Sequence, residues 1–160
     1  MTPRVGHGFD LHRLEPGRPL VVCGETLDHD RGCAAHSDGD VVYHAVTDAL
    51  LGALALGDIG ALFPDTDPAW RGADSRVFVE HALERLGQAG YTLGNLDVTV
   101  VLERPKLRPH IDAMRANLAG VLGCALGAVS VKAKTHERVD AVGRGEAIAC
   151  HVVALVLPAA

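Results

Sequence analysis

Residues 36–70 read HSDGDVVYHAVTDALLGALALGDIGALFPDTDPAW, and they predict a mostly apolar helix followed by an acidic loop. Ser37 and Asp40, three residues apart, have the spacing of a capping box, so we expect the helix to start near Asp38. Gly57 is a natural residue to end it. The apolar residues between these limits recur at i, i+1, i+4 and i+5, the spacing of one broad helix face: Val41, Val42, Ala45, Val46, Ala49, Leu50, Ala53 and Leu54.

Three polar residues of this helix, Asp40, His44 and Asp48, lie four positions apart and therefore stack along one line beside the apolar face. A core helix gains nothing from such a line, whereas a metal-binding histidine benefits from carboxylate neighbours. We therefore expect His44 to bind a metal, with Asp40 or Asp48 holding its second ring nitrogen. The alternative is ordinary solvation of the helix, which is the preferred interpretation for Asp48 alone.

The composition is that of one domain of ordinary size, covering residues 1–160. Apolar residues make up 48% of the chain but aromatic residues only 4%, so the core must be built from Val, Leu and Ala. The net charge of −5 argues against nucleic acid as a partner. Four cysteines without a CxxC pair, no signal peptide and no long uncharged apolar run predict a cytoplasmic protein with reduced thiols and no membrane contact.

Strand and helix patterns alternate along the rest of the chain. We expect strands over residues 4–14, 20–27, 93–102, 129–135 and 146–157, and helices over 75–88 and 109–122. Residues 20–27 are expected to pair with the first strand as a short N-terminal hairpin, while residues 28–35 and 58–73 are expected to be irregular. This alternation predicts an α+β chain, an α/β sandwich with its helices packed on one face of the sheet.

The first strand carries an Asp-x-His motif that can contribute to a metal site. Asp10 and His12 point to the same face because strand side chains alternate. Together with His44 they form a set of one carboxylate and two imidazoles, which suits zinc with a fourth position left open for substrate. His36 is a competing ligand. The alternative is a surface strand with polar residues at every second position.

The acidic loop after the helix has two interpretations. Asp58, Asp65 and Asp67 can position the hydroxyl groups of a substrate or a second cation. They can equally cap turns in a surface loop, as Asp commonly does. The length of the loop favours a functional role.

A basic cluster stands further along the chain. Lys106 and Arg108 follow the turn at Pro105, and another strand ends in a second group of charged residues: Lys132, Lys134, Thr135 and Glu137. Lysine side chains and free backbone N–H groups at a strand end can form a phosphate site. Glu137 can bind a divalent cation beside the phosphates. The alternative is an ordinary basic rim on an acidic protein.

With these residues in view, the chain resembles the 2-C-methyl-D-erythritol 2,4-cyclodiphosphate synthase family of the non-mevalonate isoprenoid pathway. The matching stretches are GHGFDLHRL (6–14), AHSDGDVVYHAVTDALLGALALGDIGALFPDTDPAW (35–70), ADSR (73–76), GYTLGNLDVTVV (90–101), RPKLRPHI (104–111), VKAKTHE (131–137) and GRGEAIAC (143–150). The resemblance implies a four-stranded mixed sheet backed by helices and a homotrimer with active sites between subunits.

The resemblance also implies the reaction and its cofactors. In this family the 2-phosphate of 4-diphosphocytidyl-2-C-methyl-D-erythritol 2-phosphate attacks the β-phosphorus and CMP leaves. It implies Zn²⁺ on Asp10, His12 and His44, and Mg²⁺ or Mn²⁺ on Glu137. His36 and Thr135 are implied as transition-state stabilisers.

The resemblance assigns substrate contacts in three groups. His36 and Ser37 are implied to contact the substrate beside the metal. Asp10 and His12 are implied to contact the substrate there as well. The loop around the erythritol hydroxyls corresponds to Asp58, Ile59, Gly60, Phe63, Pro64 and Asp65. The segments that bind cytosine, ribose and phosphates correspond to Leu102, Pro105, Lys106, Leu107, Arg108, Ala133, Lys134, Thr135 and Glu137.

The chain departs from the family pattern at several positions. Lys134 and His136 flank Thr135 where the family often has a threonine run, which bears on nucleotide affinity. Ala141 stands in the turn where the family often has Phe, so an aromatic contact with substrate is not expected there. Arg144 corresponds to a residue of the trimer axis, where the family can hold an isoprenoid diphosphate. By position, the resemblance still counts Ala141 and Arg144 among the substrate-binding residues.

Two other functions compete with the synthase. A zinc-dependent phosphohydrolase of a nucleotide-linked substrate would use the same ligands with a zinc-bound water as nucleophile. Asp58 is the candidate base for that water. A non-catalytic domain that only binds metal or nucleotide is the second alternative.

Overall fold

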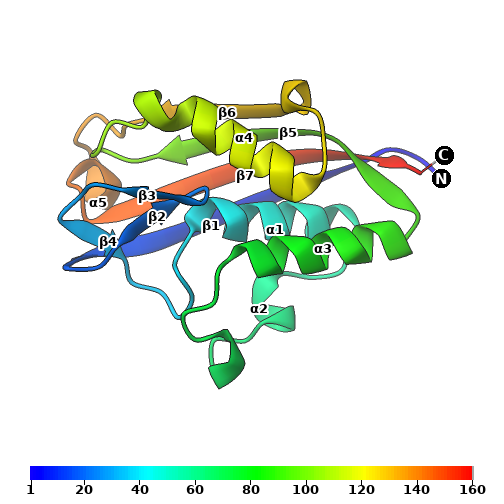
Figure 1. Cartoon of the computed structure of the whole chain (residues 1–160), viewed down its shortest axis with the longest axis horizontal. Coiled ribbons are helices and arrows are strands. Elements are labelled where there is room, and N and C mark those ends of the chain that lie inside the picture. The colour runs from blue at the N-terminus through cyan, green and yellow to red at the C-terminus, as the bar shows by residue number, and fades with distance from the viewer. Residues whose placement is uncertain (160) are drawn as a thin grey trace.

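A computed structural model describes residues 1–159, which fold into a mixed sheet with its three long helices on one side (Figure 1). The strands are β1 (Arg4–Pro16), β2 (Leu20–Val22), β3 (Glu25–Leu27), β4 (Arg31–Cys33), β5 (Tyr91–Val101), β6 (Val129–Lys134) and β7 (Ala147–Pro158). The helices are α1 (Val41–Ala53), α2 (Ile59–Leu62), α3 (Arg76–Gln88), α4 (Ile111–Leu122) and α5 (Asp140–Gly143), with 3₁₀ turns at Pro68–Trp70, Arg108–His110 and Leu126–Ala128.

The main sheet has the order β4-β1-β7-β5-β6. β7 pairs antiparallel with both β1 and β5, whereas β5 and β6 are parallel. A parallel pair needs a crossover connection, and α4 supplies it between β5 and β6. The α+β class agrees with the sequence prediction, and so does the packing of α1, α3 and α4 on one face. The short helix α5 does not, because its Val142 packs against Val101, Ala147 and Ala149 at one end of the other face.

The sheet has five strands rather than the expected four, and the N-terminal hairpin is built differently. Residues 28–35 were expected to be irregular, but β4 lies within them and pairs with the end of β1, with Leu14 opposite Cys33. Residues 20–27 were expected to form one strand beside β1, yet they form two strands that pair with each other. Cys23 and Gly24 turn the chain with φ of 54° and 75°, and a two-residue hairpin turn of type I′ requires φ > 0 at both positions.

Helix α1 starts and ends at other residues than the sequence pattern predicted. Asp40 is its N-cap and accepts hydrogen bonds from the N–H groups of Val42 and Tyr43, so Ser37 does not form a capping box. The helix was expected to end near Gly57 but ends at Ala53, because Ala55 (φ 57°) already takes the left-handed conformation that ends a helix. The following loop, residues 58–73, was expected to be irregular but contains α2 and one 3₁₀ turn.

Two glycines allow α1 to lie directly against β1. A Cβ atom at Gly8 would stand 1.8 Å from the carbonyl oxygen of Ala45, and one at Gly6 would stand 1.8 Å from that of Ala49. No side chain fits in that space, so the helix backbone touches the strand backbone. This contact fixes the height of α1 above the strand that carries Asp10 and His12.

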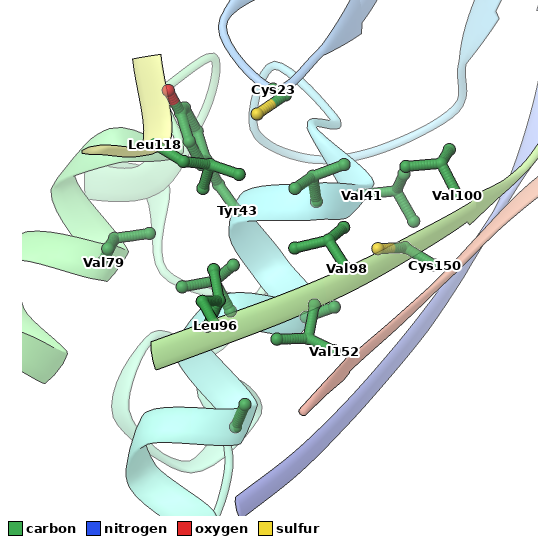
Figure 2. Packing of buried hydrophobic residues seen from close by; sticks show 14 of the residues in the cluster. Cys23, Val41, Tyr43, Val79, Leu96, Val98, Val100, Leu118, Cys150 and Val152 are labelled. Carbon is green, nitrogen blue, oxygen red and sulfur yellow. The ribbon is translucent and has the colours of Figure 1, made fainter. Parts of the chain in front are cut away.

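The core lies between the sheet and the helices and is built mainly from aliphatic side chains (Figure 2). Val98 and Val100 of β5 and Val152 of β7 point toward α1, where Val41 packs against them. Leu118 of α4 packs in the same cluster. The result agrees with the prediction of a core poor in aromatic residues.

The opposite face of the sheet is covered only at one end, by α5, and the rest of it is open and partly apolar. Val5, Phe9, Leu11 and Val153 are 65%, 47%, 49% and 43% exposed. These residues alternate with those that face α1, as a strand with one covered face requires. The open face is therefore a surface with an apolar centre.

The state of the cysteines and the length of the helices bear on two predictions made from composition. Cys23, Cys33, Cys124 and Cys150 are free thiols, as expected, and all but Cys124 are buried. Among residues 1–159 no helix has the length and apolar character needed to cross a membrane.

Gly8→Ala tests the contact between α1 and β1. The added methyl group must push the helix off the strand, and we expect the free energy of unfolding to fall by at least about 2–3 kcal/mol. Gly52→Ala is the matched control, because its nearest neighbour would be 3.8 Å away in an exposed helix position. That variant should be neutral or stabilised by about 0.5–1 kcal/mol. Urea denaturation measures both, and equal stability of the two variants would contradict the account.

Candidate functional site

Asp10, His12 and His44 form a compact group between β1 and α1. Asp10 Oδ2 lies 3.0 Å from both His12 Nε2 and His44 Nδ1, and these two nitrogens are 3.1 Å apart. Asp10 and His12 project from the same face of β1 because one residue separates them. The structure thus brings together the three residues that the sequence predicted, and His36 is not part of the group.

The donor set fits a divalent cation. Two ligand atoms about 2.0–2.1 Å from a tetrahedral ion are roughly 3.3 Å apart, close to the separations within this group. One carboxylate and two imidazoles leave a fourth position for another ligand. His44 is only 9% exposed, so its ring is held in place before any ion binds.

The electrostatics of Asp10 agree with this interpretation. Burial opposes ionisation of the carboxyl group, but hydrogen bonds and charge interactions with His12 and His44 outweigh it. The pKa of Asp10 therefore lies well below its ordinary value. An ionised carboxylate is the form that binds a cation.

The predicted role of Asp40 and Asp48 beside His44 was wrong. Asp40 is fully buried and accepts hydrogen bonds from the backbone N–H groups of Gly24 (2.7 Å), Val42 (3.0 Å) and Tyr43 (3.2 Å). Asp48 accepts one from the N–H of Ile59 at 2.7 Å, which attaches the loop after α1 to the helix. Both carboxylates therefore bind backbone groups, because buried N–H donors need acceptors.

The outer nitrogen of His44 instead faces two serines. His44 Nε2 lies 2.9 Å from Ser75 Oγ and 3.1 Å from Ser37 Oγ. Ser75 donates in turn to the carboxylate of Asp38. Sequence reasoning missed Ser75 and Asp38, because Ser75 comes from the start of α3 and no spacing pattern relates it to His44.

A cavity of about 500 Å³ opens in front of the three-residue group. Besides that group it is lined by residues from three segments: Ala34, Ala35, His36, Ser37, Ile59, Gly60, Phe63, Pro64, Asp65, Trp70 and Phe78. Most of the residues that were expected to contact the erythritol part of a substrate lie here. Asp58 does not line it, since its carboxylate caps α2 by accepting from the N–H of Ala61 at 2.9 Å.

Aromatic side chains form one wall of this cavity, which sequence reasoning did not predict. The Phe63 ring lies 4.8 Å from that of Phe78 and 5.1 Å from that of Trp70, measured between centroids. His36 Nε2 lies 3.1 Å from the carbonyl oxygen of Asp67, so the loop also touches the predicted substrate contact. The wall holds the loop against α3.

A second cavity of about 660 Å³ lies at the β6 edge of the sheet. It is lined by much of the predicted basic segment and its neighbours: Leu102, Lys106, Leu107, Arg108, Ile111, Asp112, Val131, Lys132, Ala133, Lys134 and Thr135. Three of these residues are lysines, so the cavity suits an anionic ligand. Pro105 lies in the turn beside it.

The remaining predicted residues follow β6. Thr135 Oγ1 lies 3.3 Å from Glu137 Oε1, and Glu137 has the left-handed backbone conformation with φ of 51°. Arg144 is paired with Glu146 at 2.9 Å near a third cavity, and Ala141 is half-buried in α5. The structure does not bring Glu137 into the group around Asp10.

The metal cavity and the β6 cavity are far apart within one chain. They share no lining residue, and the strand order places β7 and β5 between β1 and β6. Three strand spacings correspond to roughly 14 Å. The sequence predicted both groups of residues, but not their separation.

Comparison with known proteins identifies the family. The YgbB family model matches residues 3–157. A chloroplastic 2-C-methyl-D-erythritol 2,4-cyclodiphosphate synthase of Catharanthus roseus is 58% identical over 154 residues, which cover 96% of this chain and 65% of that protein. The synthase of Citrobacter koseri is 55% identical over 157 residues, covering 98% of this chain and 99% of that protein. The chain thus spans just under two thirds of the plant relative and nearly all of the bacterial one.

Solved structures of similar fold belong to the same kind of synthase. A 2C-methyl-D-erythritol-2,4-cyclodiphosphate synthase in its CDP-bound form matches with a TM-score of 0.89 and 42% identity, covering 96% of this chain and 100% of that chain. The CDP complex of IspF from Plasmodium falciparum matches with a TM-score of 0.88 and 31% identity, covering 99% and 98%.

The fold, with its Asp-His-His group, is that of the YgbB family, and the chain belongs to this family. The relatives that it matches are 2-C-methyl-D-erythritol 2,4-cyclodiphosphate synthases. The resemblance stated from the sequence is therefore confirmed.

The pH dependence of stability tests the buried carboxyl group of Asp40. Burial raises its pKa to about 6, although the N–H groups of Gly24, Cys23 and Tyr43 act to lower it. The unfolded carboxyl group titrates near pH 4, so between pH 4 and 6 the folded state holds more of the proton. The contribution of this group to stability must therefore fall as the pH rises through that window.

We expect the unfolding free energy of the wild type relative to Asp40→Asn to fall by about 1–3 kcal/mol between pH 4 and 7, because the variant cannot titrate there. Urea denaturation at each pH measures the difference. A difference that stays constant or grows would show that the backbone donors outweigh burial.

Proposed function

We propose that the chain cyclises 4-diphosphocytidyl-2-C-methyl-D-erythritol 2-phosphate to 2-C-methyl-D-erythritol 2,4-cyclodiphosphate and releases CMP. This is the activity for which its relatives are named, a phosphorus–oxygen lyase reaction of isoprenoid biosynthesis. The observation that carries the proposal is the group of Asp10, His12 and His44 beside a substrate-sized cavity, in a chain that matches the family over residues 3–157.

Asp10, His12 and His44 would hold Zn²⁺, which when bound acts as a Lewis acid on the β-phosphate. The zinc assignment is supported by the donor set, since one carboxylate and two imidazoles are typical of catalytic zinc. The low pKa of Asp10 keeps its carboxylate ionised, and each imidazole can present a neutral nitrogen. Glu137 is the residue that would hold Mg²⁺ or Mn²⁺ beside the α- and β-phosphates.

The reaction needs alignment and charge stabilisation rather than a protein nucleophile. An oxygen of the 2-phosphate forms a bond to the β-phosphorus, and the bond from that phosphorus to the oxygen of CMP breaks. His36 and Thr135 would donate hydrogen bonds to the phosphate oxygens as charge moves among them. The aromatic wall of Phe63, Trp70 and Phe78 would exclude water, which competes with the 2-phosphate.

The β6 cavity would bind the cytidine nucleotide. Lys106 and Lys134 supply positive charge. Ala133 of the edge strand β6 and Thr135, which follows that strand, present backbone groups that can bind the cytosine ring. Relatives of the same fold have been solved with CDP bound. Lys132 also pairs with Asp97 at 2.7 Å, so it is held on the open face of the sheet.

A homotrimer would bring the two cavities together. A separation of roughly 14 Å across the sheet is long for one substrate to bridge within a chain, but a neighbouring copy can present its β6 edge to the metal group. The apolar centre of the open face, with Phe9 and Leu11 exposed, supports packing against other copies. Residues 1–160 would form a single domain in each subunit.

The rival phosphohydrolase gains no support from the site. Its candidate base, Asp58, uses its carboxylate as the N-cap of α2 and lies outside the lining of the metal cavity. Incubation with the cytidine diphosphate substrate separates the two functions. The synthase yields the cyclic diphosphate and CMP, whereas linear phosphates would contradict the proposal.

His44→Ala tests the metal site. The variant loses one of three ligands, so we expect zinc content after dialysis to fall below about one tenth of the wild-type content and cyclisation to fall by at least about 10³-fold. His29→Ala is the control, since His29 lies between β3 and β4 and lines neither the metal cavity nor the β6 cavity. Metal analysis with a coupled CMP assay gives both quantities, and full turnover by a zinc-free His44→Ala protein would refute the catalytic role of the site.

A further inference from the structure

We propose that Ser75, backed by Asp38, is the positioning residue that orients His44 for metal binding; this inference rests on the proposed metal site. The observation is a chain of three groups that runs from His44 Nε2 to Ser75 Oγ and on to the Asp38 carboxylate. None of the three is a neighbour of the next along the sequence. They come from the loop before α1, from α1 itself and from the start of α3.

The direction of the hydrogen bonds follows from the chemistry of the groups. A carboxylate only accepts, so the single hydroxyl proton of Ser75 goes to Asp38. The lone pairs of Ser75 Oγ are then free to accept, and the nearest donor is His44 Nε2 at 2.9 Å. When a cation takes the lone pair of Nδ1, His44 carries its ring proton on Nε2 and donates it to Ser75. Without a cation, Nδ1 lies 3.0 Å from the Asp10 carboxylate and is placed to donate to it.

Ser37 is a weaker candidate for the same role. Its Oγ lies 3.1 Å from His44 Nε2, and it already accepts the N–H of Gly39 at 3.2 Å. Ser37 also lines the metal cavity and is half-buried, whereas Ser75 is completely buried. Ser75 thus makes the shorter contact from a position that substrate does not reach.

The start of α3 gives a second, independent observation. Ser75 occupies the N-cap position of this helix, where a serine hydroxyl normally accepts an N–H of the first turn. Here its side chain makes no capping hydrogen bond. Asp74 accepts the N–H of Arg76 instead, at 2.9 Å. The hydroxyl is thus committed to His44 and Asp38 at the expense of a contact that would stabilise its own helix.

The Asp38 carboxylate is itself firmly held. It accepts the N–H of Ser75 at 3.1 Å and that of Asp40 at 3.0 Å, while the N–H of Asp38 donates to the carbonyl of Ala73. These backbone contacts remain when the Ser75 hydroxyl is removed. The variant Ser75→Ala therefore deletes the link to His44 while it leaves the clamp between the two segments in place.

The experiment measures zinc affinity without substrate, by competition with a chelator. Removal of a partner behind a metal-binding histidine typically weakens affinity 10–100-fold, and we expect that loss for Ser75→Ala. Ser75→Thr, which keeps a hydroxyl group, should restore affinity to within about fivefold of the wild type. The control is Thr47→Val, which removes a fully buried hydroxyl that donates to Tyr43 on the same helix as His44. It should bind zinc within about twofold of the wild type.

A folded Ser75→Ala protein with zinc affinity within about twofold of the wild type would overturn the inference. If circular dichroism shows that Ser75→Ala does not fold, Asp38→Asn is the variant to measure, since it keeps the shape of the side chain but removes the charge behind Ser75. We expect it to bind zinc at least about threefold more weakly than the wild type. Unchanged zinc binding would overturn the inference. The CMP assay on the wild type separates the two claims. Normal cyclisation with zinc affinity insensitive to Ser75 refutes only this inference, and absent cyclisation with the expected zinc effect refutes only the proposed function.

Discussion

The backbone contact between α1 and β1 is the constraint on which the site depends. Glycines at positions 6 and 8 let the helix lie against the strand, with no space for a Cβ atom between them. Because this contact fixes the position of α1 on β1, the Nδ1 atom of His44 lies 3.0 Å from Oδ2 of Asp10. Because the strand alternates, the same contact directs His12 to the metal side and Phe9 to the open face of the sheet. The geometry of the group is thus a result of main-chain packing rather than of the ligands themselves.

Most carboxylates near this site accept hydrogen bonds from backbone N–H groups. Asp40 caps α1 and binds the hairpin at Gly24, Asp48 holds the loop at Ile59, and Asp58 caps α2. Among the carboxylates of residues 1–159, it is Asp10 that faces the two imidazoles. The acidic character of residues 36–70 is therefore largely structural, and it places the loop and the aromatic wall around the Asp10 carboxylate.

The sequence predicted what depends on local periodicity. The alternation of β1, the apolar face of α1 and the Asp-x-His motif led to the three ligands, and the quoted motifs led to the family. It did not predict β4 or the turn at Cys23, which form because neighbouring segments pair with them. Nor did it predict Ser75 as the partner of His44, since that contact joins two helices. The spacing of Asp40 and Asp48 was misleading because a residue before a helix binds the free N–H groups of its first turn.

The central claim is that one active site combines the metal group of one copy with the nucleotide cavity of another. The direct measurement mixes two inactive variants, His44→Ala and Glu137→Gln, in equal amounts under conditions that exchange subunits. If each site draws its halves from neighbouring copies, about a quarter of the sites regain both intact halves, and cyclisation returns to about a quarter of the wild-type rate. If both halves belong to the same chain, the mixture stays inactive, and that result would contradict the account.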